Sequence, residues 1–188
     1  MFGEQGVWTS DSRLGQLNCG VAEVLIALGS NVGDSLNNLR VAAKMLEREF
    51  GPLMASQIYR TAPMYVEDQP PFLNAAVSCS SLQSPRSVLA TLKRLEQEIG
   101  RAPRERNGPR EIDLDLVAYG RLSYQFMEDN ILKLTVPHPA IPERRFVLQP
   151  LNDIVPNTLI PGLGVVSDLL ARTELQRDHV ITLSDALL

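Results

Sequence analysis

The sequence contains few residues of the kinds that build zinc sites or disulfide frameworks. Only two cysteines, Cys19 and Cys79, and two histidines occur in 188 residues, and neither cysteine belongs to a CxxC motif. Zinc sites need clustered Cys and His ligands, and disulfide-rich domains need several paired cysteines. The composition therefore excludes both classes and favours a reduced protein of the cytoplasm.

Excess positive charge, long apolar runs and a leader pattern are also absent. Eighteen Lys and Arg stand against 22 Asp and Glu, which gives a net charge of −4, whereas nucleic-acid and anionic-membrane binders carry a basic excess. The longest apolar runs, such as residues 24–28, are far shorter than the roughly 18–20 residues that cross a bilayer. Residues 1–20 contain one cation, Arg13, and no apolar stretch typical of a signal peptide. We expect a cytoplasmic monomer with no nucleic-acid and no membrane partner.

The chain length predicts one domain over residues 23–188. Domains typically span about 100–150 residues, so there is room for one core and some additional structure. Residues 1–22 mix polar and single apolar residues without period, which predicts a poorly ordered extension.

Strand and helix patterns alternate through the first part of this domain. Apolar runs predict strands over residues 24–28, 54–60, 72–82 and 112–117. Apolar residues at spacings of three and four predict helices over residues 35–50 and 85–99. This β-α-β-β-α-β order predicts an α+β, ferredoxin-like core, in which an antiparallel four-stranded sheet has both helices on one face. Residues after Gly120 form a C-terminal extension with one helix near 166–172.

Asp113 and Asp115 alternate with apolar residues in the last predicted strand, so both side chains leave the same face. Their Cα atoms lie about 6.5–7 Å apart, which suits one bridged divalent cation or two bound cations. Like charges on one strand face repel without a counter-charge, although a solvated strand face is the alternative. Oxygen ligands without His or Cys favour Mg²⁺ over Zn²⁺.

The loop just before this pair is basic in an otherwise acidic protein. It carries Arg101, Arg104, Arg106 and Arg110 and one acid between residues 100 and 110. Guanidinium groups match phosphate oxygens, and Mg²⁺ held by one or two carboxylates completes its shell with substrate phosphates. The loop and the aspartates together predict polyphosphate binding, and a basic loop paired with acids elsewhere is the alternative.

The turn after the first predicted strand, residues 29–34, lacks the Lys-Ser/Thr ending of a P-loop and the third glycine of a dinucleotide fingerprint. A nucleotide would therefore be held by arginines and metal. A second basic cluster combines His138, flanked by two prolines, with Arg144 and Arg145. His138 either faces an anion there or is a structural histidine.

Five short motifs follow one another along the chain. They are ALGSN at 27–31, YRT at 59–61, QPPFLNA at 69–75, GPREIDLD at 108–115 and VPHP at 136–139. In this order and spacing they resemble the 6-hydroxymethyl-7,8-dihydropterin pyrophosphokinase family, over about residues 24–160. The resemblance implies a Mg²⁺-dependent diphosphotransferase of tetrahydrofolate biosynthesis. Such an enzyme transfers diphosphate from ATP to the pterin hydroxymethyl oxygen and releases AMP, so its expected partners are these small molecules.

The resemblance also implies roles for individual residues. Asp113 and Asp115 match the pair that binds two Mg²⁺ ions and, with Arg101 and Arg110, the catalytic group. The implied ATP-binding residues are Glu96, Arg101, Arg110, His138 and Arg144. The implied pterin-binding residues are Thr61, Met64, Phe72, Asn74 and Phe146. For Glu96, a solvated acid on a helix surface is the alternative.

Three other functions stay open at this point. They are a same-fold kinase or pyrophosphokinase with a different acceptor, a catalytically silent nucleotide-binding module, and an RNA-binding sheet. The intact Asp113 and Asp115 pair argues against the silent module. An RNA-binding sheet needs exposed aromatic residues and a basic surface, whereas only 5% of this sequence is aromatic.

Asn107 is a departure from the family, because many members have Trp immediately before Gly-Pro-Arg, on a loop that closes over the site. We expect Asn107→Trp to raise the affinity for ATP several-fold if the loop closes, since an aromatic stack contributes about 0.5–1.5 kcal/mol beyond its buried area. Calorimetric titration with a non-hydrolysable ATP analogue measures this effect. Unchanged affinity together with unchanged turnover would show that position 107 does not face the site.

Overall fold

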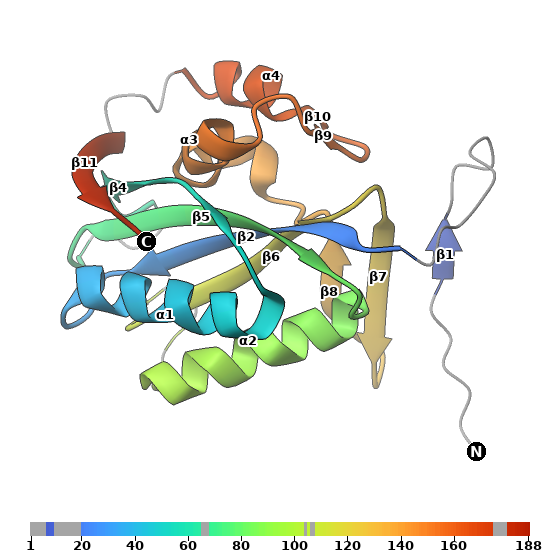
Figure 1. Ribbon diagram of the computed structural model, residues 1–188, viewed down its shortest axis with the longest axis horizontal. Coiled ribbons are helices and arrows are strands. Elements are labelled where there is room, and N and C mark those ends of the chain that lie inside the picture. Colours follow the sequence, from blue (N-terminus) through green and yellow to red (C-terminus); the bar gives the residue numbers. More distant parts are fainter. Residues whose placement is uncertain (1–6, 10–19, 65–67, 104, 106–107, 175–179) are drawn as a thin grey trace.

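The computed structural model describes residues 7–9, 20–64, 68–103, 105, 108–174 and 180–188. A twisted antiparallel sheet separates two helical layers (Figure 1). On one face lie α1 (Ser35–Phe50) and α2 (Pro85–Ile99), and on the other face lie α3 (Arg145–Ile154) and α4 (Val166–Ala171). The protein is therefore of the α+β class, as the sequence predicts.

The sheet confirms the β-α-β-β-α-β prediction. Its core strands are β2 (Ala22–Ser30), β4 (Gln57–Thr61), β5 (Phe72–Ser81) and β6 (Asp113–Tyr119), and the short β3 (Met54–Ala55) also pairs with β5. The core strands lie in the order β4-β5-β2-β6, and every neighbouring pair is antiparallel. This is the ferredoxin-like arrangement.

Both core helices begin and end where their caps predict. Asp34 and Ser84 each accept a hydrogen bond from a backbone N–H three residues further on, at 3.1 and 3.2 Å, and Pro85 occupies the first position of α2. Gly100 ends α2 in the left-handed region, with φ 104° and ψ 21°. The chain thereby turns directly into the loop that begins at Arg101.

Two hydrophobic cores lie on opposite faces of the sheet. The first packs strands against α1 and α2 and includes Leu28, Leu39 and Leu92, all buried. The second packs the other face against α3 and α4 and includes Leu148 and Leu169. Because each strand alternates its side chains, the acids of β6 share a face with the second core.

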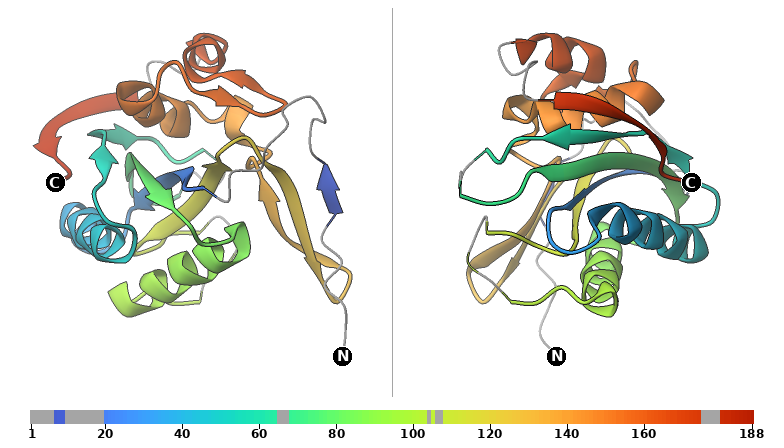
Figure 2. Two further views of the ribbon diagram at one scale, coloured as in Figure 1. Left: turned by 45° about the vertical axis from the view of Figure 1, so that its right-hand side comes forward. Right: turned by 90° about the vertical axis from the view of Figure 1, so that its left-hand side faces the viewer.

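The C-terminal part adds the second helical layer (Figure 2). The predicted helix near 166–172 is confirmed as α4, whereas α3 has no counterpart in the prediction. Pro150 lies inside α3, and an interior proline removes a backbone donor and typically ends a helix. The expectation that both core helices lie on one face is confirmed, and the helices of the C-terminal extension cover the other face. The remaining short elements are η1 (Ile141–Glu143), β9 (Leu159–Ile160) and β10 (Gly164–Val165).

A second sheet lies beside the core. Its hairpin, β7 (Ser123–Glu128) and β8 (Ile131–Val136), turns at Asp129 and Asn130, which both have positive φ, 50° and 58°. The strand β1 (Val7–Thr9) pairs with β7, so three residues of the predicted extension form a strand, while residues 1–6 and 10–19 lie outside the described residues. A last strand, β11 (Val180–Ala186), extends the main sheet beside β4.

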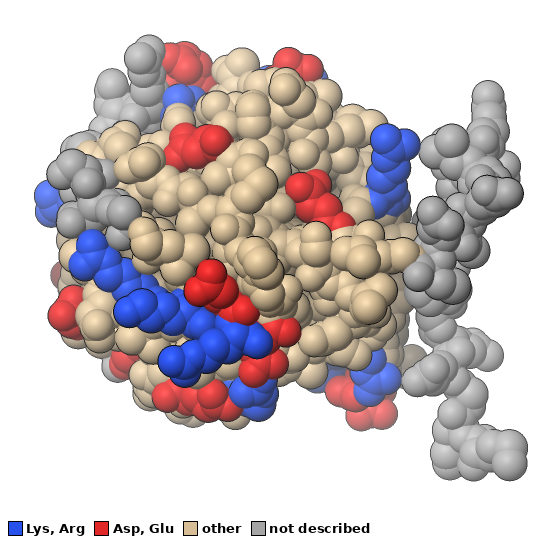
Figure 3. Space-filling model, viewed as in Figure 1, with Lys and Arg blue, Asp and Glu red and all other residues tan. Residues whose placement is uncertain are grey.

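Charges of both signs cover the surface of the first helical layer. In Figure 3, Lys and Arg side chains gather at the lower left, over α1 and α2, with Asp and Glu beside them. Arg94 of α2 pairs with Glu98 at 2.6 Å and with Glu49 of α1 at 2.7 Å. No helix in the described part of the chain is long and apolar enough to span a bilayer.

Gly100→Ala tests the end of α2. A Cβ at this position would meet no heavy atom within 4 Å, so its cost is backbone strain alone, about 1–2 kcal/mol of unfolding free energy. Urea unfolding measures this loss. The control Gln97→Ala, on an exposed position of α2, should change the unfolding free energy by less than about 0.5 kcal/mol. An unchanged midpoint for Gly100→Ala would contradict the left-handed conformation.

Candidate active site

An open cleft of about 700 Å³ beside the start of α3 brings together most of the predicted site residues. Its walls come from β2, β4, β5, β6 and α3, which lie far apart in the sequence. The predicted residues that line it are Thr61, Met64, Phe72, Asn74, Arg110, Asp113, Asp115, Arg144 and Phe146. Three further predicted residues, Glu96, Arg101 and His138, are not among its lining residues.

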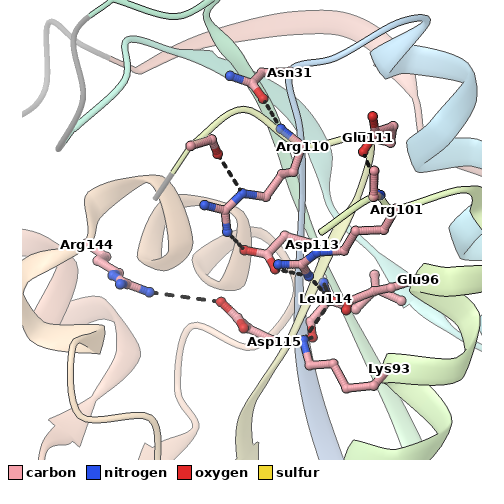
Figure 4. A network of polar contacts seen from close by, with 12 residues as sticks. Asn31, Lys93, Glu96, Arg101, Arg110, Glu111, Asp113, Leu114, Asp115 and Arg144 are labelled. Atoms are coloured by element: carbon pink, nitrogen blue, oxygen red, sulfur yellow. Dashed lines mark hydrogen bonds and ion pairs between the residues drawn. The ribbon is translucent and has the colours of Figure 1, made fainter. Parts of the chain in front are cut away.

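Asp113 is held by two arginines (Figure 4). Its Oδ1 accepts from Arg101 and its Oδ2 accepts from Arg110, both at 2.6 Å. Burial acts to raise the pKa of the Asp113 carboxyl, but the charges of Arg110, Arg101 and Lys93 outweigh it and hold the pKa below its ordinary value. Asp113 is therefore an ionised and fully paired carboxylate.

Asp115 lies two residues along the same strand, and no cation in the described part of the chain pairs with it as closely. Arg144 approaches its Oδ2 only to 4.0 Å. Burial and the neighbouring charge of Asp113 raise the pKa of Asp115 above its ordinary value, although Lys93, His138 and Arg144 act in the opposite direction. The surroundings of Asp115 thus favour the binding of one further positive charge beside its carboxylate.

Glu96 contradicts the solvated-acid alternative. It is 3% exposed, and its Oε1 accepts from Lys93 at 2.7 Å, from the backbone N–H of Leu114 at 2.7 Å and from Arg101 at 2.6 Å. Glu96 therefore lies behind the cleft, where it links α2 to β6 and orients the Arg101 guanidinium toward Asp113.

His138 is half-buried beside the acid pair. Its backbone N–H donates to Val117 on β6 at 2.9 Å, and its Nδ1 accepts from Ala140 at 3.2 Å. Burial lowers the pKa of His138, against the raising effect of Asp115. The imidazole therefore keeps its proton on Nε2, which leaves one N–H donor that the backbone does not use.

The apolar part of the cleft contains the two predicted rings, Phe72 and Phe146. Asn74 is buried beside them and donates to the hydroxyl of Thr61 at 2.8 Å. A Cβ on Gly29 would lie 3.2 Å from Asn74 Oδ1, so glycine at this position leaves room for the amide. The amide presents both donor and acceptor groups at the cleft.

Asn31 organises the cleft but is missing from the predicted site residues. It is 4% exposed, its Oδ1 accepts from Arg110 N–H at 2.8 Å, and its amide donates to Gln69 at 3.1 Å and to Pro70 at 3.0 Å. Asn31 thus joins the loop before β5 to the arginine loop, the basic loop of residues 100–110. The ALGSN motif contains Asn31, and this was the signal that could have identified it. Lys93, which donates to Glu96, is also missing from the predicted site residues, and none of the five motifs contains it.

The donor set fits a hard divalent cation. Among the described residues no group of three or more His, Cys, Asp or Glu side chains could hold a metal ion. Asp113 and Asp115 nevertheless supply carboxylate oxygens on one wall of the cleft, and Mg²⁺ binds through one or two carboxylates when phosphates and waters complete its shell. The incompletely neutralised Asp115 supports this fit.

A sequence model of the 7,8-dihydro-6-hydroxymethylpterin-pyrophosphokinase (HPPK) family matches residues 25–156. The chain belongs to the HPPK family. The matched residues include every predicted site residue from Thr61 to Phe146. Arg104, Arg106 and Asn107, on the arginine loop, lie outside the described residues.

The relatives of this chain include a pyrophosphokinase and a bifunctional folate synthesis protein. The 2-amino-4-hydroxy-6-hydroxymethyldihydropteridine pyrophosphokinase of Aquifex aeolicus is 34% identical over 75% of this chain and 85% of its own length. The mitochondrial folate synthesis bifunctional protein of Pisum sativum is 44% identical over 79% of this chain. The chain spans about a quarter of that relative, 27% of its length.

A solved structure shares the HPPK fold. The crystal structure of Plasmodium falciparum HPPK-DHPS with pterin and p-hydroxybenzoate matches with a TM-score of 0.68 and 16% identity, over 91% of this chain and 49% of that chain. At this identity the likeness shows the fold alone.

Glu96→Gln tests the buried link of this HPPK site. The substitution keeps the side-chain shape but leaves Arg101 and Lys93 beside a neutral group, so we expect a loss of about 2–4 kcal/mol of unfolding free energy in urea. The matched control is Glu98→Gln on the same helix, because Glu98 also pairs with an arginine but is 45% exposed. Equal effects of the two substitutions would contradict a buried role for Glu96.

Proposed function

We propose that this chain transfers the diphosphate of ATP to 6-hydroxymethyl-7,8-dihydropterin, with AMP and the pterin diphosphate as products, in tetrahydrofolate biosynthesis. The observation that carries the proposal is the joining of two chemistries in one cleft. Asp113 and Asp115 with Arg110 suit a metal-bound triphosphate, and Phe72 and Phe146 suit a flat ring. The pyrophosphokinase relatives support the same reaction.

The arginines that hold Asp113 are the proposed phosphate ligands. Each guanidinium presents planar donors that fit phosphate oxygens as well as a carboxylate. When the triphosphate enters, Arg101 and Arg110 exchange Asp113 for phosphate oxygens, and Glu96 keeps Arg101 beside the cleft. Arg144 and the Nε2–H of His138 supply further donors. The positive charge then fixes the triphosphate and stabilises charge that develops during transfer.

The exchange also frees Asp113 to act as a ligand. Asp113 and Asp115 would hold two Mg²⁺ ions, which when bound neutralise phosphate charge and align the transferred group. The two carboxylates occupy one strand face, so β6 fixes their separation. The rigid sheet thereby positions the polyphosphate relative to the acceptor.

The apolar part of the cleft is the proposed pterin site. Phe72 and Phe146 would contact the two faces of the ring, and Met64 would add apolar contact. The buried amide of Asn74, beside Thr61, would recognise the polar ring edge by both donating and accepting hydrogen bonds. A ring with a different edge would leave this amide unpaired, which costs binding free energy.

Product analysis tests the proposal directly. The protein is incubated with ATP, Mg²⁺ and 6-hydroxymethyl-7,8-dihydropterin, and the phosphorus signals are followed by ³¹P NMR, with a control that lacks the pterin. We expect AMP and the pterin diphosphate in equal amounts, only when the pterin is present. Stoichiometric ADP would favour the kinase alternative, and absence of turnover would favour the silent binding module.

Asp115→Asn should lower turnover by at least about 10³-fold, equivalent to about 4 kcal/mol of transition-state stabilisation. The substitution removes a charged metal ligand but keeps the side-chain volume. Steady-state AMP release at saturating Mg²⁺ measures the loss. Asp129→Asn, at the exposed turn between β7 and β8, is the matched control and should retain full turnover. Near-normal turnover of Asp115→Asn would show that this acid is merely solvated.

A further inference from the structure

At the start of α3, the middle one of three consecutive residues points away from the cleft that the other two line. Arg144 and Phe146 line the cleft, and the Arg144 guanidinium lies 5.8 Å from the centre of the Phe146 ring. Arg145, between them, is 7% exposed and points away from the cleft, toward the end of α4. A buried arginine between two site residues needs an explanation.

The partners of Arg145 form a single anchor at the end of α4. Its Nη1 donates to the Leu170 carbonyl at 3.3 Å and to the Thr173 hydroxyl at 3.4 Å, and lies 3.5 Å from Glu174. Its Nη2 donates to Gln149 of α3 at 3.3 Å. Thr173 is itself 4% exposed, and its hydroxyl donates to Leu170 at 2.8 Å. The anchor therefore joins the first turn of α3 to the segment after α4.

This anchor is not a helix cap, because a guanidinium has no acceptor to offer to the backbone N–H groups of the first turn. No side chain among the described residues caps the first turn of α3, although orphan N–H groups at a helix start normally attract such a cap. The other end of α3 is held separately, because Asp153 accepts from the Tyr59 hydroxyl at 2.9 Å. Burial and the Asp153 carboxylate raise the pKa of Tyr59 to about 12, so this donor stays protonated.

We propose that Arg145 is a positioning residue, and that its anchor at the end of α4 fixes Arg144 and Phe146 in the cleft. The partners of Arg145 on the α4 side lie beyond residue 156, where the match to the family ends. The C-terminal segment of this chain thus helps to position residues of the site. The inference rests on the proposed function, because Phe146 is assigned to the pterin and Arg144 to the phosphates.

Measurements of affinity and turnover distinguish a positioning role of Arg145 from a purely stabilising one. If the anchor sets the first turn of α3, its loss displaces Phe146 and Arg144 while Asp113 and Asp115 stay on β6. The affinities for pterin and ATP then fall more than the rate of transfer at saturation. A purely structural contact would lower the melting temperature and leave both affinities unchanged.

The experiment compares Arg145→Met, Thr173→Val and the double variant. Dihydropterin affinity is followed by its fluorescence, and KM and kcat by AMP release. We expect each single variant to raise the dissociation constant and KM of the pterin by about 5–10-fold, equivalent to about 1–1.4 kcal/mol of binding free energy, with a smaller loss of kcat. The double variant should be no worse than Arg145→Met, because the two residues act through one contact.

The control is Tyr59→Phe, which removes one hydroxyl from the opposite anchor of α3. It should lower the melting temperature without changing the pterin affinity. Unchanged affinity in Arg145→Met, or effects that multiply in the double variant, would overturn the inference. If Arg145→Met does not fold, unchanged affinity in Thr173→Val overturns it equally. A wild-type protein that binds no dihydropterin would instead contradict the proposed function.

Discussion

The contact between Asp113 and two guanidinium groups is the interaction on which the cleft depends. Arg101 and Arg110 reach this carboxylate from the two ends of one loop, each at 2.6 Å. Behind them, Glu96 fixes Arg101 and Asn31 fixes the backbone of Arg110. The loop ends are therefore fixed by buried polar contacts with α2 and with the residue that follows β2, and these contacts hold Arg101 and Arg110 beside Asp113.

The two faces of the sheet support different parts of the site. The first core holds α2, and with it the buried acid that orients Arg101. The second core holds α3, which carries Arg144 and Phe146 to the cleft. A four-stranded core with helices on one face would supply the acids and the loop but not this wall. The C-terminal layer thus completes the cleft, and its own anchor at Arg145 ties site geometry to packing.

Local patterns predicted the core well because its signals are local. Apolar periodicity, the Ser84 cap and Gly100 are each readable within a few residues, and the alternation around Asp113 places both acids on one face. Long-range contacts carry no such signal. Nothing near Glu96 indicates that Leu114 and Arg101 bury it. Likewise, Pro150 lies inside α3, and an interior proline argues against a helix when the sequence alone is considered. The cleft wall that positions Phe146 could therefore be identified only from the fold.

The most direct test of the central claim is an anomalous difference map from crystals grown with Mn²⁺, a non-hydrolysable ATP analogue and the dihydropterin. The account predicts manganese peaks within about 2.5 Å of carboxylate oxygens of Asp113 and Asp115, with Arg101 and Arg110 moved onto phosphate oxygens. Manganese bound elsewhere, with both arginines still paired to Asp113, would contradict it.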